Sequence, residues 1–66
     1  MPIISVQIVT GRTAEQKRAL MKGLAAATVD ALSVAEESVR VILTEVPPEH
    51  WGIGQTTKAE RDGYKG

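Results

Sequence analysis

Two stretches of the chain alternate between apolar and polar positions with the period of a β-strand. In residues 3–9, Ile4, Val6 and Ile8 fall on one face, while the opposite face is mixed. Residues 39–46 repeat the alternation and end at a proline pair, which cannot donate hydrogen bonds to a ladder. Both stretches are rich in β-branched residues, which favour strands. We therefore expect one strand in each stretch.

A helical pattern lies between the two expected strands. Thr13 and Gln16 have the spacing of a capping box, in which each side chain bonds the backbone N–H of the other residue. From there to about Leu32 the composition favours helix, and apolar side chains recur at helical intervals. The stripe consists of Leu20, Leu24, Ala27 and Ala31, with Met21, Thr28 and Leu32 beside it. We expect one helix of about 20 residues that packs this stripe against the strands.

The order strand, helix, strand predicts an α/β fold built from a single β-α-β unit. The two strands should run parallel and be joined by a right-handed crossover. Residues 49–66 become polar after a short Trp-Gly-Ile-Gly segment, and we expect them to form a short C-terminal hairpin or extension. At this length, residues 1–66 are expected to form one domain.

Such a unit cannot cover its own sheet. Parallel strands are normally covered on both faces, and one helix covers only one of them. Ile3, Val9 and Ile42 would therefore face solvent unless another chain covers them. A domain this short buries only about 60% of the surface that its unfolded chain exposes. The chain has no cysteine, so disulfides cannot compensate, and we expect assembly into a homo-oligomer.

Composition argues against several classes of partner. Eight basic and eight acidic residues cancel, and Trp51 and Tyr64 are the only aromatic residues, so a basic face for nucleic acid is not expected. No apolar stretch approaches the roughly 20 residues that span a bilayer, and the first residues do not resemble a signal peptide. The single histidine, His50, cannot form a zinc site alone. We expect a soluble, cytoplasmic protein without a metal site.

Pro2 is the first residue with a candidate chemical role. A proline at this place can simply begin a strand, where its missing N–H is harmless. If Met1 is removed, however, Pro2 carries a secondary amine at the N-terminus. An α-amino group has a pKa of about 7.7–8.0 in model peptides, and desolvation or nearby cations favour its neutral form. Such an amine is suited to act as a general base near neutral pH.

Two arginines stand where they could bind an anion. Arg12 follows the glycine after the first strand, and Arg40 interrupts the second strand on the face that it shares with Ile42. An arginine in a turn is often only solvated. A charge within an apolar strand has to emerge at an edge, pair with an acid or bind an anion. Guanidinium groups bind carboxylates in bidentate fashion, so two of them near one amine would suit a small dicarboxylate.

The segment Trp51-Gly52-Ile53-Gly54 can be interpreted in two ways. It lacks the third glycine and the following helix of the dinucleotide-binding fingerprint. Trp51 could fill a core or an interface, or it could form the wall of a ligand site. We expect the preceding residue, His50, in a surface turn.

Taken together, these residues resemble the 4-oxalocrotonate tautomerase family of the tautomerase superfamily. The resemblance covers almost the whole chain, through the segments MPI, GRTAEQK, SVRVILTEV and HWGIG. It implies a short β-α-β chain that assembles into a homohexamer, built as a trimer of dimers. It also implies a cofactor-independent isomerase, an amino-terminal proline as general base and a place in aromatic hydrocarbon catabolism.

The resemblance further implies a role for each site residue. Pro2 would take a proton from an enol such as 2-hydroxymuconate and return it to a different carbon. Arg12 would bind one carboxylate, and Arg40, from a neighbouring subunit, would engage the 2-hydroxyl group and the other carboxylate. Trp51 stands where the best-known members have phenylalanine, and it would form an apolar wall that keeps the amine neutral.

Other functions fit the same sequence. Relatives in the superfamily have hydratase, dehalogenase or decarboxylase activity, usually with an extra acidic residue, and the two arginines fit a tautomerase better. A non-catalytic oligomeric module on the same fold is a further alternative. The substrate could be a dicarboxylate, or an enol acid with one carboxylate such as phenylenolpyruvate.

Overall fold

A parallel ladder joins β1 (Ile3–Val9) to β2 (Arg40–Val46) in the computed structural model, which describes residues 1–63. The register pairs the first residues of the two strands and, six positions later, their last residues. The first strand has the predicted bounds. The second begins one residue later than predicted, because Val39 still belongs to the turn that follows the 3-10 helix η1 (Glu36–Ser38). The parallel β-α-β unit is thereby confirmed.

The helix α1 (Ala14–Leu32) begins at the predicted capping box. The Thr13 hydroxyl accepts a hydrogen bond from the Gln16 backbone N–H at 3.1 Å, and the Thr13 N–H donates to the Gln16 side chain at 3.0 Å. The helix ends at Ser33, whose backbone is left-handed with a φ of 55° and whose N–H donates to the Val29 carbonyl. Within the described residues, no helix is both long and apolar enough to cross a membrane.

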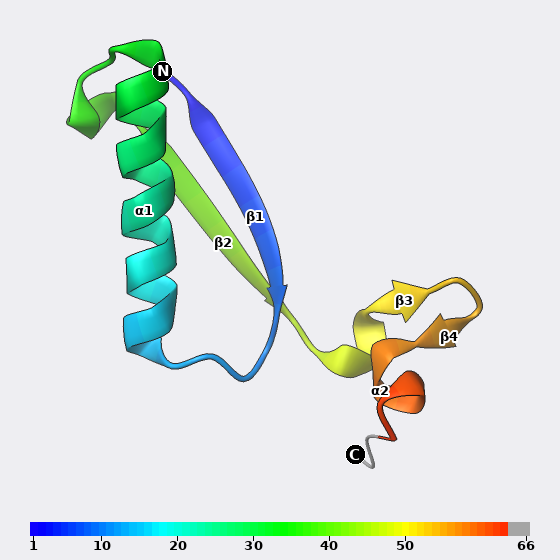
Figure 1. Cartoon of the computed structure of the whole chain (residues 1–66). Coiled ribbons are helices and arrows are strands. Elements are labelled where there is room, and N and C mark those ends of the chain that lie inside the picture. Colours follow the sequence, from blue (N-terminus) through cyan, green and yellow to red (C-terminus); the bar gives the residue numbers. More distant parts are fainter. Residues whose placement is uncertain (64–66) are drawn as a thin grey trace.

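The helix covers one face of the two strands (Figure 1). The positions that it buries differ from the predicted stripe. Its half-buried positions are Lys17, Met21, Leu24, Ala25, Thr28 and Val29. Leu24 belongs to the predicted stripe, whereas Leu20, Ala27 and Ala31 are exposed. The helix is rotated so that Met21 and Leu24, rather than two alanines, contact the strands. Long apolar side chains bury more area per contact than alanine does, which favours this orientation.

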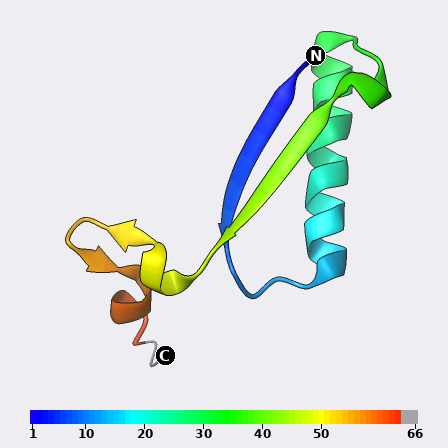
Figure 2. The ribbon, with the colours of Figure 1, turned by 180° about the vertical axis from the view of Figure 1, so that it is seen from behind.

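Among residues 1–63, no helix covers the opposite face of the strands, which is visible from behind in Figure 2. Ile3 and Ile42 lie there and are 64% and 52% exposed, while Val9 is half-buried. Among residues 1–63 only Val39, Pro48 and Ala59 are buried. The accessible area of 5078 Å² exceeds the value of about 4,100 Å² that is typical of a folded monomer of this mass. The predicted need for a covering surface is therefore visible in the structure.

The last part of the chain forms an arm, residues 47–63, that projects beyond the C-terminal ends of both strands (Figure 1). Its elements are η2 (Pro48–His50), β3 (Gly52–Ile53), β4 (Thr56–Thr57) and α2 (Lys58–Arg61). The antiparallel pairing of β3 with β4 confirms the predicted short hairpin. The arm gives the chain a radius of gyration of 15.1 Å, against about 11 Å for a compact domain of this length. An arm with so few contacts to its own strands is suited to pack on another copy.

We predict that Ile42→Asp disrupts self-association, because it places an uncompensated charge on the uncovered apolar face. Sedimentation velocity at a fixed protein concentration should show smaller species than for the parent chain. Ala19→Glu is the matched control, since Ala19 is exposed on the side of α1 that faces away from the strands. An Ile42→Asp variant of unchanged mass would show that this face is not the interface.

Candidate active site

Pro2 and Arg40 lie at the same end of the ladder within one chain. The Arg40 backbone N–H donates to the Pro2 carbonyl at 3.0 Å, and Arg40 pairs with Ile3 in the register. Pro2 is half-buried, and Arg40 is exposed. The strand pairing thus brings the candidate base and one candidate cation together without any side-chain contact.

The Arg40 side chain is held over the 3-10 turn that precedes its strand. Its Nη1 atom donates to the Glu37 carbonyl at 2.6 Å and to the Val39 carbonyl at 3.3 Å. Both acceptors are backbone carbonyls, and among residues 1–63 no carboxylate pairs with Arg40, so none competes with an incoming anion. The resemblance implies that Arg40 comes from a neighbouring subunit, whereas the structure already has Arg40 of the same chain at the Pro2 end.

Arg12 lies at the opposite end of the ladder. The Thr10 N–H extends the ladder by donating to the Val46 carbonyl at 3.1 Å. Gly11 then turns the chain with a φ of 120°, a conformation that favours glycine because a side chain would be strained there. Arg12 follows in the loop and is exposed, directly before the residue that caps α1. The turn and the cap together fix the place of this arginine.

Trp51 enters the same region from the arm. It is half-buried, its N–H donates to the Pro48 carbonyl at 3.3 Å, and its carbonyl accepts from the Lys58 N–H at 2.7 Å. The hairpin turns back at Gly54, which has a φ of 62° and stands first in a two-residue loop, a place that favours glycine. The glycines of this segment therefore shape a hairpin and no phosphate-binding loop.

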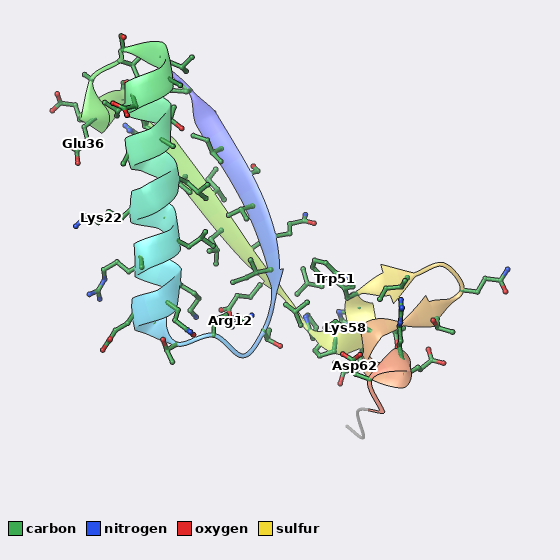
Figure 3. All side chains as sticks on the ribbon, viewed as in Figure 1. Arg12, Lys22, Glu36, Trp51, Lys58 and Asp62 are labelled. Atoms are coloured by element: carbon green, nitrogen blue, oxygen red, sulfur yellow. The ribbon has the colours of Figure 1, made fainter. Side chains whose placement is uncertain are left out.

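A cavity of about 560 Å³ lies between the end of β1 and the arm. Figure 3 shows Arg12 on one side of it and Trp51, Lys58 and Asp62 on the other. The lining residues are Gln7, Ile8, Val9, Thr10, Gly11, Arg12, Trp51, Lys58 and Asp62. Two of the four predicted site residues thus line one cavity, with an aromatic wall and a cation for an anionic ligand.

Of the three cations near this cavity, Arg12 has no carboxylate partner among the described residues, whereas Lys17 and Lys58 each have one. Lys17 pairs with Glu45 at 2.9 Å, and Lys58 pairs with Asp62 at 2.6 Å. Within residues 1–63, no carboxylate lies within ion-pair distance of Arg12. Lys17 and Arg12 also line a smaller cavity of about 230 Å³ beside the start of α1, where Glu45 neutralises the lysine. A bound carboxylate would therefore meet Arg12 as its main partner.

The two halves of the candidate site are separated by the length of β1. Six residue steps at about 3.3 Å each place Ile3 and Val9 about 20 Å apart. No side chain spans that distance, so Pro2 and Arg12 of one chain cannot contact one small molecule. A site with all four predicted residues requires the Pro2 end of one copy to meet the Arg12 end of another.

Sequence reasoning missed Lys58 and Asp62 as cavity residues. It described residues 49–66 only as a short hairpin or extension, although Thr57 and Glu60 have capping-box spacing and Lys58 and Asp62 have i,i+4 spacing. Both signals are realised in α2. The final three residues of the chain lie outside the described part.

Comparisons with known proteins agree with this architecture. Residues 2–61 match the family model for tautomerase enzymes. A probable tautomerase of Ralstonia nicotianae is 48% identical over 59 residues, covering 89% of this chain and 84% of that protein. A 2-hydroxymuconate tautomerase of Pseudomonas sp. strain CF600 is 44% identical over 54 residues, covering 82% and 86%. A solved heterohexameric 4-oxalocrotonate tautomerase from Chloroflexus aurantiacus J-10-fl has a TM-score of 0.86 and 40% identity, covering 91% of this chain and 97% of that one.

These relatives match the parallel β-α-β unit along nearly its whole length. The fold and the similarity together show a small isomerase with tautomerase activity. The chain belongs to the tautomerase family, within its 4-oxalocrotonate tautomerase group.

The capping box beside Arg12 gives a prediction about stability. Thr13→Ala removes the acceptor for the Gln16 N–H and should lower the free energy of unfolding by about 1 kcal/mol. Urea unfolding at a fixed protein concentration measures this loss. Thr13→Ser keeps the hydroxyl group and should retain most of the stability. Equal losses in both variants would contradict a capping role.

Proposed function

We propose that the chain is a cofactor-independent tautomerase for a 2-hydroxydienoate such as 2-hydroxymuconate, with the amine of Pro2 as its general base. Removal of Met1 frees that amine. The observation that carries the proposal is the division of the site. The candidate base and Arg40 share one end of the ladder, while Arg12 and Trp51 line one cavity at the other.

In the proposed reaction, the Pro2 nitrogen removes the proton of the 2-hydroxyl group. The carbonyl forms at C2, the double bonds shift, and the same proton returns to C5, which leaves the remaining C=C between C3 and C4. Arg40 binds the C1 carboxylate and the oxygen at C2. Arg12 binds the C6 carboxylate and stabilises the charge that is delocalised towards it. Trp51 forms a wall that excludes water and favours the neutral amine.

Two copies supply each proposed site. One contributes Pro2 and Arg40, and the other contributes Arg12 and Trp51 from its loop and arm. The uncovered face with Ile3 and Ile42 supports this assembly, as does the similarity to a heterohexameric relative. We infer a homohexamer, built as a trimer of dimers, in which each copy contributes to more than one site.

The charges in the cavity favour isomerisation over addition of water. Among the described residues, Asp62 is the only carboxylate that lines the cavity, and Lys58 holds it at 2.6 Å. The cavity thus presents two cations, Arg12 and Lys58, against one carboxylate. This balance suits an anionic enol acid better than the activation of water by an acidic residue, and it supports a tautomerase rather than a hydratase or dehalogenase.

Pro2→Ala tests the general base. We expect kcat for 2-hydroxymuconate ketonisation to fall about 100-fold or more, because general-base catalysis typically contributes at least that factor. The measurement is the change in ultraviolet absorbance, on samples whose intact mass shows that Met1 has been removed. Circular dichroism and sedimentation should match the parent chain. Undiminished turnover would rule out Pro2 as the base.

Mixed oligomers test the division of the site. Pro2→Ala and Arg12→Ala chains, each inactive alone, are co-expressed with different C-terminal tags, and doubly tagged oligomers are purified. Random assembly should leave about one quarter of the sites with both residues intact, so about one quarter of the activity should return. A site formed within one chain would recover nothing in this experiment.

A further inference from the structure

The arm carries a second cation into the cavity that contains Arg12. Lys58 is the first residue of α2, and its N–H donates to the Trp51 carbonyl at 2.7 Å. The helix is capped by Thr57, whose hydroxyl accepts from the Glu60 N–H at 3.1 Å. The backbone of Lys58 is therefore fixed directly beside the aromatic wall (Figure 3).

The side chain of Lys58 lines the cavity with Arg12 and Trp51. Its Nζ atom lies 2.6 Å from Oδ2 of Asp62, and about a third of the side chain, 35%, is exposed. An i,i+4 ion pair that water still reaches is weak, so a substrate carboxylate can replace Asp62 as the partner of the ammonium group. The pair holds the lysine at the cavity and leaves it available.

We propose that Lys58 is a specificity-determining residue that binds, together with Arg12, the C6 carboxylate of the substrate, at the end away from the enol. Two cations on one carboxylate favour dicarboxylates over enol acids with a single carboxylate next to the enol. Asp62 competes with the substrate for Lys58 and limits the affinity. This inference rests on the proposed tautomerase function and deepens it.

Lys58→Gln tests the residue in turnover. We expect KM for 2-hydroxymuconate to rise about tenfold, the effect of losing one hydrogen bond to a charged group, with kcat within about twofold. Both constants for phenylenolpyruvate should stay within about twofold, because its carboxylate is next to the enol. Arg61→Gln is the matched control, since Arg61 is exposed in the same helix and does not line the cavity.

Asp62→Asn tests the contact between Lys58 and the substrate carboxylate by strengthening it. It removes the competing carboxylate, so KM for 2-hydroxymuconate should fall about threefold while that for phenylenolpyruvate is unchanged. Lys58→Arg keeps the positive charge and should recover at least half of the dicarboxylate preference. If Lys58 had a purely structural role, Lys58→Gln would change the constants for both substrates alike. Asp62→Asn would then not lower KM for 2-hydroxymuconate.

A binding measurement separates this inference from the proposed function. Trp51 is the only tryptophan of the chain, so quenching of its fluorescence reports on ligands in the cavity. The probes are cis,cis-muconate, which has two carboxylates, and phenylpyruvate, whose single carboxylate is next to its keto group. Lys58→Gln should weaken binding of muconate about tenfold and leave binding of phenylpyruvate unchanged.

Equal effects on both probes, or none on muconate, would overturn the role of Lys58 even if the chain ketonises 2-hydroxymuconate. Suppose that Lys58→Gln weakens binding of muconate only, and that the parent chain does not ketonise 2-hydroxymuconate. Lys58 would then be upheld as a carboxylate ligand, and the proposed reaction would be rejected.

Discussion

The parallel ladder between β1 and β2 is the interaction on which the rest of the structure depends. It pairs Ile3 with Arg40 and thereby brings Arg40 to Pro2, although 38 positions separate them in the chain. The same ladder holds Val9 beside Val46, so the loop with Arg12 and the beginning of the arm leave the sheet at one common end. Every candidate site residue is thus placed relative to one seven-residue strand pair.

With this ladder, a single chain lacks two things: a cover for one apolar face and a site that holds all the candidate residues. The helix α1 covers one face, and Ile3 and Ile42 stay exposed on the other. The strand β1 separates Pro2 from Arg12 by about 20 Å. Contact between copies answers both, because it can cover the open face and bring opposite ladder ends together. Stability and the proposed catalysis therefore both require assembly, which fits a chain too short to build a core of its own.

Ion pairs give different roles to the three cations that line the two neighbouring cavities, Arg12, Lys17 and Lys58. Glu45 neutralises Lys17, Asp62 neutralises Lys58, and Arg12 faces the cavity without a carboxylate partner among the described residues. Arg12 is therefore ready to bind an anion, whereas Lys58 must first leave Asp62. This arrangement gives the arm an influence on which anion is bound, in addition to its contribution to the aromatic wall.

The sequence by itself determined the β-α-β order, both strands, the helix with its cap and the uncovered face, because these follow from local periodicity and from the spacing of Thr13 and Gln16. It also indicated Pro2, Arg12, Arg40 and Trp51 as candidates. Only the tertiary structure decided which side of α1 faces the sheet, because Leu20 and Met21 are neighbouring apolar residues on the helix surface, and Met21 is half-buried while Leu20 is exposed. It alone showed that Trp51 and Lys58 of the arm meet Arg12 in one cavity, at the end of the ladder opposite Pro2 and Arg40. Such neighbourhoods arise from strand register and from the direction of the arm, which no local pattern encodes.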